Sequence, residues 1–211
     1  MSQAAATLSP RTSAETRLVM SISAAHFVSH YYILMLPPLF DIIRADYGVS
    51  YTELGLALVA FNVVTAVGQT PAGILVDRFG ARPLLIGGLL IGALAFALAG
   101  LIHSFWLMVV MFGVAGVGNT VYHPSDYSLL SHHIPPERVA KAFSIHTFSG
   151  MLGSTAAPAS LLMMQSLWGW RGAFIGAATL GFAVAGLLLV QRDEPPAVQP
   201  VKPTQATTGP T

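Results

Sequence analysis

Residues 73–83 read Gly73-Ile74-Leu75-Val76-Asp77-Arg78-Phe79-Gly80-Ala81-Arg82-Pro83, and they separate two long apolar segments of the chain. Gly73 lacks a Cβ atom and can therefore let a neighbouring helix backbone come close, while Gly80 permits a tight turn. Asp77 can accept hydrogen bonds from the positive N-terminal end of a helix, and Arg78 or Arg82 can pair with an acid. We interpret this segment as a short charged turn between two packed helices.

The composition indicates that these helices lie in a lipid bilayer. Hydrophobic residues make up 54% of the 211-residue chain and charged residues only 9%, whereas a soluble domain carries about 25% charged residues. The apolar residues also lie in long runs rather than at one-face spacing, which is typical of helices in lipid. The net charge of +1 does not favour nucleic-acid binding, and the lack of cysteine excludes disulfides, thiolate metal sites and cysteine nucleophiles.

Six apolar runs are long enough to cross a bilayer, which requires about 20 helical residues. They are Leu18–Phe40, Tyr51–Val76, Pro83–Ile102, Phe105–Leu130, Ala140–Gln165 and Trp170–Val190. The sequence therefore predicts a cytoplasmic N-terminal segment at 1–17, a six-helix transmembrane domain at 18–190, and a disordered cytoplasmic tail or linker at 191–211. The first connection between helices is predicted at 44–48.

The basic residues predict the orientation of these helices. With a cytoplasmic N-terminus, the inside segments contain Arg11, Arg17, Arg78, Arg82, Arg138, Lys141, Arg192 and Lys202. The outside segments then contain only Arg44 and Arg171. This asymmetry follows the positive-inside rule. We therefore expect a multi-pass protein of the cell (inner) membrane with both termini in the cytoplasm.

Polar residues are distributed unevenly among the six helices. The third and sixth contain almost none and are expected to face lipid, because polar groups at membrane depth are costly unless they face protein or water. Helices one, two, four and five should surround an interior cavity for substrate or protons. Its predicted residues are His26, His30, Tyr31, Asn119, Tyr122, His123 and His146. Histidine can carry a proton near neutral pH; the alternative is a neutral imidazole that is hydrogen-bonded between helices.

The segment 73–83 resembles the signature loop of the major facilitator superfamily, with a glycine, an acid four residues later, an arginine, a second glycine and another base. Residues 134–142 are similar to the usual loop between helices 4 and 5 of that family. Gly116, Gly118 and the Tyr122-His123-Pro124 run resemble its fosmidomycin-resistance-like branch. The resemblance implies an all-α membrane protein, a six-transmembrane-helix bundle that forms one half of a major facilitator superfamily fold (3+3 helices).

The same resemblance implies a cytoplasmic gate, in which an acid near the end of helix 4 is the partner of the loop. In this sequence the gate residues are Gly73, Asp77, Arg78, Gly80, Arg82 and Asp126. Two departures argue against drug/proton antiport: Phe112 stands where many such exporters have arginine, and the Gly-Pro pair of their fifth helix is absent. Gly150 and Gly153 of that helix still permit close packing.

The expected function is half-size secondary active transport of a small solute, by uptake or efflux, through alternating access with proton coupling. The expected partners are the lipid bilayer, a small-molecule substrate and a second six-helix half, either a second copy in a homodimer or a separate chain. No enzyme activity, cofactor, metal or nucleic acid is expected. Two alternatives stay open: a haem-binding electron-transfer membrane protein with histidine ligands, and a truncated half that does not transport.

Overall fold

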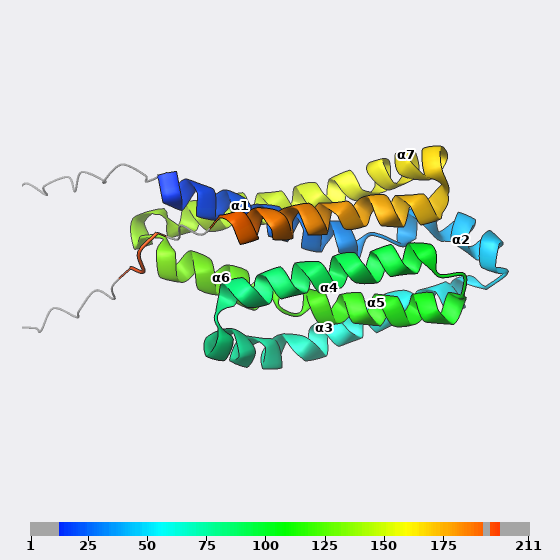
Figure 1. The fold of residues 1–211 in the computed structure, drawn as a ribbon, viewed down its shortest axis with the longest axis horizontal. Helices are drawn as coiled ribbons and strands as arrows, with labels where there is room; N and C mark the ends of the chain where they lie inside the picture. The colour runs from blue at the N-terminus through cyan, green and yellow to red at the C-terminus, as the bar shows by residue number, and fades with distance from the viewer. Residues whose placement is uncertain (1–12, 192–194, 199–211) are drawn as a thin grey trace, which may run out of the picture.

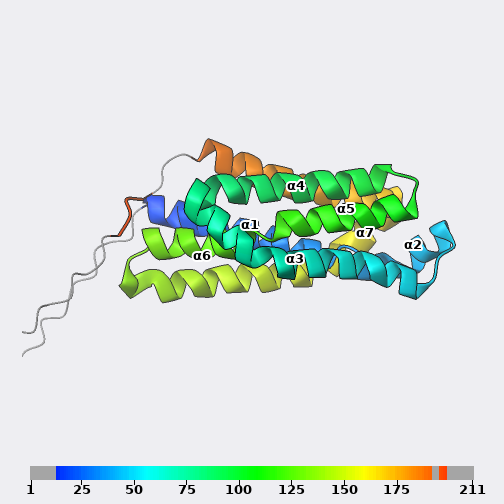
Figure 2. The ribbon, with the colours of Figure 1, turned by 90° about the horizontal axis from the view of Figure 1, so that it is seen from below.

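The computed structural model describes residues 13–191 and 195–198, and all the regular structure within them is helical. The elements are α1 (Ser13–Ile33), the 3-10 helix η1 (Pro37–Leu39), α2 (Phe40–Tyr47), α3 (Tyr51–Phe79), α4 (Ala81–Leu101), α5 (Phe105–Asn119), α6 (Tyr122–His133) and α7 (Pro136–Val190). The long helices lie side by side along one axis, and the first and last described segments lie at the same end of the bundle (Figures 1 and 2). The prediction of an all-α bundle is confirmed.

The helix α7 consists of two antiparallel arms. Gly169 has φ 71° and ψ 170°, which are not helical, and the chain reverses direction there, from the yellow arm to the orange arm in Figure 1. Glycine adopts a positive φ without steric cost. The described chain has 5 helices that are long and apolar enough to cross a membrane. Because α7 crosses twice, the bundle has the predicted six crossings.

Two of the predicted spans are interrupted helices. The first leaves the α-helix at Ile33, before Pro37 and Pro38 start η1, because proline lacks the N–H that would continue the ladder. The loop predicted at 44–48 is consequently the end of α2, and the chain turns at Gly48 with φ 66°. The span predicted at Phe105–Leu130 breaks between α5 and α6, where Pro124 cannot donate a backbone hydrogen bond to the preceding turn.

The expected assignment of lipid-facing and interior helices stays a prediction for α3 and α4, whose burial differs. In α4, Leu85, Leu89 and Phe96 are fully buried, because this helix packs between α5 and α7. An apolar helix can be buried in protein as readily as in lipid. By contrast, α3 leaves Val67 72% exposed and Ile74 66% exposed. The polar pattern alone could not tell protein burial from lipid contact.

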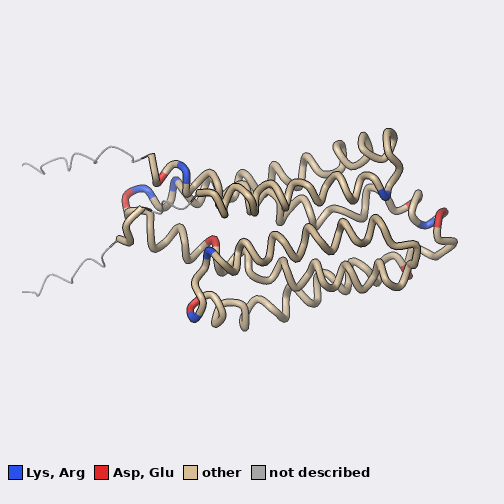
Figure 3. The backbone as a smooth tube through the Cα atoms, in the orientation of Figure 1, with Lys and Arg blue, Asp and Glu red and all other residues tan. Residues whose placement is uncertain are grey.

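Charged residues gather mainly at the end of the bundle where both termini lie (Figure 3). At that end, part of the predicted tail contacts the bundle: the Val198 N–H donates to the His132 carbonyl at 2.7 Å, and His133 Nδ1 lies 2.6 Å from the Pro195 carbonyl oxygen. Parts of the predicted N-terminal segment and tail lie outside the described residues, namely 1–12, 192–194 and 199–211. The predicted tail therefore stays a prediction.

Candidate functional site

Histidines from three helices meet around one aspartate in the interior of the bundle. His26 and His30 come from α1, His123 and Asp126 from α6, and His146 from α7. The ring centroid of His26 lies 4.5 Å from that of His30, 5.3 Å from that of His123 and 3.7 Å from that of His146. We call these five residues the histidine–aspartate cluster. It unites the four histidines predicted for the cavity.

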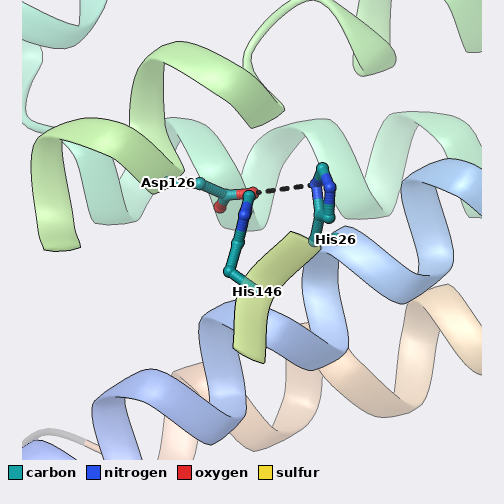
Figure 4. Close-up of side chains that lie close together, drawn as sticks. All are labelled: His26, Asp126 and His146. Atoms are coloured by element: carbon teal, nitrogen blue, oxygen red, sulfur yellow. Dashed lines mark hydrogen bonds and ion pairs between the residues drawn. The ribbon is translucent and has the colours of Figure 1, made fainter. Parts of the chain in front are cut away.

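Asp126 is the acceptor at the centre of this cluster. The residue is 0% exposed, and its Oδ2 atom lies 3.0 Å from His146 Nε2 and 3.6 Å from His26 Nδ1. Figure 4 shows the carboxylate beside the two imidazoles, whose rings stack on each other. Within the described part of the chain, Asp126 Oδ1 and His26 Nδ1 are buried without a hydrogen-bond partner. Such atoms are costly, so the cluster offers unused binding capacity.

Two glycines of α7 allow α1 to come close enough to form the cluster. A Cβ atom on Gly150 would lie 2.5 Å from His26 Cδ2 and 3.0 Å from His30 Cδ2. A Cβ atom on Gly153 would collide with the backbone carbonyl oxygen of Phe27. Small residues at helix interfaces let backbones approach each other in membrane proteins. The prediction that these glycines permit close packing is therefore confirmed.

Two of the three remaining predicted cavity residues, Asn119 and Tyr31, bind serines on neighbouring helices. Asn119 Oδ1 accepts a hydrogen bond from Ser29 Oγ at 2.8 Å, and the Tyr31 hydroxyl lies 2.7 Å from Ser160 Oγ. These contacts join α1 to α5 and to α7. The hydroxyl of Tyr122 is buried and, among the described residues, has no partner.

Sequence reasoning missed the serine partners, including Ser154, whose Oγ lies 3.2 Å from His30 Nδ1. Serine is common at helix–helix contacts in membrane proteins, so only its placement opposite a histidine could have singled it out.

The hydrogen bond and ion pairs of Asp126 go to histidines, and the other predicted gate residues have their own surroundings. Gly80 turns with φ 91°, as expected, and Arg82 Nη2 donates to the Leu188 carbonyl at 2.6 Å, which is favourable at a helix C-terminus. Asp77 and Arg78 are exposed. Two expectations differ from the structure. Gly73 was expected to allow a close helix contact, but a Cβ built on it meets no described atom within 4 Å. Asp126 was expected to be the partner of the loop, but it pairs with histidines.

The arrangement of the histidines does not suit haem. The rings of His26 and His146 are stacked, with 24° between their planes and 3.7 Å between their centroids. Two axial ligands of a haem lie on opposite faces of a porphyrin, with the macrocycle between them. Stacked imidazoles leave no room for a macrocycle. The geometry therefore disfavours the electron-transfer alternative.

Comparisons with known proteins agree on a transporter fold. The family model described as Major Facilitator Superfamily matches residues 22–210. Over 143 residues the chain is 29% identical to the "Probable L-galactonate transporter" of Escherichia coli (strain K12), covering 68% of this chain and 32% of that protein. It is 32% identical over 146 residues to the "Probable sulfoacetate transporter SauU" of Cupriavidus necator, covering 68% and 34%.

Among solved structures, a bacterial homologue of the human lysosomal transporter Spinster, in an inward-facing and unoccupied conformation, has the same fold. Its TM-score is 0.82 at 17% sequence identity, and the match covers 93% of this chain and 47% of that one. The chain spans about a third of the length of the curated relatives above. It therefore matches one part of a longer architecture.

Proposed function

The chain belongs to the major facilitator superfamily, and from this premise we propose that it forms one six-helix half of a secondary active transporter. It moves a small solute across the cell (inner) membrane by alternating access. The observation that carries this proposal is the buried histidine–aspartate cluster. Ionisable residues within membrane helices are rare and costly, and those that face the bundle interior mark substrate or ion pathways.

We propose that a second six-helix unit completes the transporter. In transporters of this superfamily the two halves are related by an axis along the membrane normal. Both ends of this bundle lie on the same side (Figure 1), so a second copy has the orientation that this symmetry requires. The basic residues favour the cytoplasm for that side. The apolar face of α3, with Val63 54% exposed and Val67 72% exposed, is the surface that the second unit covers.

We further propose that transport is coupled to proton movement through the cluster. His26 is faced by His30 on its own helix, by His123 and Asp126 of α6, and by His146 of α7. Imidazole can gain and lose a proton near neutral pH. A cluster that is exposed in turn to each side of the membrane can therefore exchange protons with both.

The proposed substrate is a small polar organic molecule. The two relatives described above are named for transport of L-galactonate and sulfoacetate, which are organic acids. The cluster of this chain supplies imidazoles and a carboxylate, and Tyr122 of the same helix as Asp126 adds a buried hydroxyl. An acidic solute would consequently need its cationic partner from the second six-helix unit.

The mass of the detergent-solubilised complex, combined with uptake into liposomes, tests this proposal. The chain has a mass of 22.2 kDa, and we expect a protein complex of at least twice that mass. Liposomes that contain this complex should accumulate a labelled sugar acid when a proton gradient is imposed. A complex with one chain only, together with no uptake of sugar acids or of hydrophobic dyes, would contradict the proposal.

A further inference from the structure

We propose that His26, Asp126 and His146 form a binding site for one divalent transition-metal ion of the zinc and cobalt class. This inference concerns ion binding by the chain and does not rest on the transport proposed above. The three residues come from α1, α6 and α7 and are all buried. Sequence analysis predicted no metal site, because the three ligands are far apart along the chain and form no ligand motif.

The positions of the ligand atoms suit a single ion. One ligand atom from each of the three residues lies within 4.8 Å of the other two. Asp126 Oδ2 lies 3.6 Å from His26 Nδ1 and 3.0 Å from His146 Nε2. A tetrahedral zinc ion with bonds of about 2.0–2.1 Å holds its ligand atoms about 3.4 Å apart. Rotations of the side chains are therefore enough to bring the three atoms around one ion.

The lack of hydrogen-bond partners for two of these buried atoms also points to a ligand. Within the described residues, His26 Nδ1 and Asp126 Oδ1 are buried without a hydrogen-bond partner, and the Nδ1–Oδ2 separation of 3.6 Å exceeds a normal hydrogen bond. A metal ion bonds directly to the free nitrogen and to one or both carboxylate oxygens. An ion bound to both carboxylate oxygens and to His26 Nδ1 would thus satisfy two of the buried atoms that lack partners among the described residues.

The chemistry of the ligands selects the class of ion. Two imidazole nitrogens and one carboxylate oxygen suit zinc, cobalt and related divalent metals, whereas magnesium and calcium prefer oxygen ligands alone. One carboxylate with two neutral imidazoles has a net negative charge, which a divalent cation reverses. His30 and His123 flank His26 at 4.5 Å and 5.3 Å between ring centroids. Water can occupy the remaining coordination position.

Metal titration of the purified full chain tests the site. The protein is prepared in detergent without a histidine tag, treated with a chelator, and titrated with Co²⁺ and then Zn²⁺. We expect one Co²⁺ per chain with the strong visible absorption of four-coordinate cobalt, and loss of that absorption when Zn²⁺ displaces it. The proposal would be overturned by the unmodified protein alone if it bound no stoichiometric Co²⁺, or if it gave only the weak absorption of hydrated Co²⁺.

Variants then test which residues bind the ion. Asp126→Asn and His146→Gln should each lower the affinity for Zn²⁺ by at least about tenfold. The matched control is His103→Gln, because His103 lies in the short connection between α4 and α5, outside the cluster. Circular dichroism confirms that each variant keeps its helices. Unchanged affinity in both cluster variants would show that the metal binds elsewhere and would refute this assignment.

Discussion

The charged turn at residues 73–83 and the histidine–aspartate cluster are built in opposite ways. The turn is one continuous segment, and its shape depends on a single backbone feature, the positive φ of Gly80. Its charged residues Asp77 and Arg78 are exposed. The cluster joins three helices, and its members His26, Asp126 and His146 are buried. The turn thus depends on local sequence, and the cluster depends on the packing of the whole bundle.

This difference separates two kinds of information. The turn can be recognised in the sequence and identifies the family, but it contributes little to the interior chemistry. The cluster contains the groups that can bind a proton, a metal ion or a solute, yet no short motif encodes it. Substitutions in the cluster should therefore have larger effects than substitutions in the turn.

Asp126→Asn should cause the largest loss of transport. The substitution keeps the size of the side chain but removes the negative charge that His26 and His146 face at 3.6 Å and 3.0 Å. Coupling between two bound ligands is typically worth about 5–150-fold, and we expect proton-driven uptake to fall by a factor in this range. Uptake into liposomes measures it, with helicity as the control for folding. Uptake at the unmodified rate would remove Asp126 from the mechanism.

His26→Ala and His30→Ala should each lower proton-linked transport by roughly tenfold, because one of the interacting imidazoles is lost. Uptake is measured at several external pH values, since a proton carrier affects both the rate and its pH dependence. Expression should stay intact, because one neutral histidine contact between helices contributes only about 1 kcal/mol. If both variants transported at normal rates with unchanged pH dependence, the coupling assignment would be wrong.

The sequence predicted the crossings and the turn because their signals are local. Apolar runs, basic residues and Gly80 need no knowledge of packing. It also predicted the four histidines, since a polar group at membrane depth stands out among apolar neighbours. It could not pair Asp126 with His146, because the pairing depends on the interruption between α5 and α6. That interruption directs Asp126 into the bundle rather than toward the turn.

The exposure of α3 was not predictable for a related reason. A helix with an apolar face satisfies lipid, the bundle interior or a second unit equally well. The polar residues Asn62, Thr65 and Gln69 in the run from Tyr51 to Phe79 do not separate these three environments. Only the packing of α4 against α5 and α7 shows that α4, the more apolar helix, buries one face in the bundle, while Leu94 and Leu101 stay exposed.

Gly153→Ala should destabilise the bundle by about 1–3 kcal/mol, the usual cost of overpacking. The new methyl group collides with the backbone carbonyl of Phe27 in α1, and a backbone cannot rotate away as a side chain can. The matched control is Gly186→Ala in the other arm of α7, where a Cβ meets no described atom within 4 Å. Thermal unfolding in detergent measures both variants. Equal melting temperatures would show that α1 and α7 do not need this close contact.

Asp77→Asn should have the smallest effect on stability and a moderate effect on transport. Asp77 is exposed, and surface substitutions away from special features change stability little, so the melting temperature should stay within about 2 °C of the unmodified protein. Uptake should fall severalfold, because the turn is proposed to gate the cytoplasmic side. Glu53→Gln, at the opposite end of α3, is the control for removing an acid from the same helix. The opposite result would be a large loss of stability in Asp77→Asn, with normal transport by the protein that remains folded. In that case the turn would have a structural role and would not gate transport.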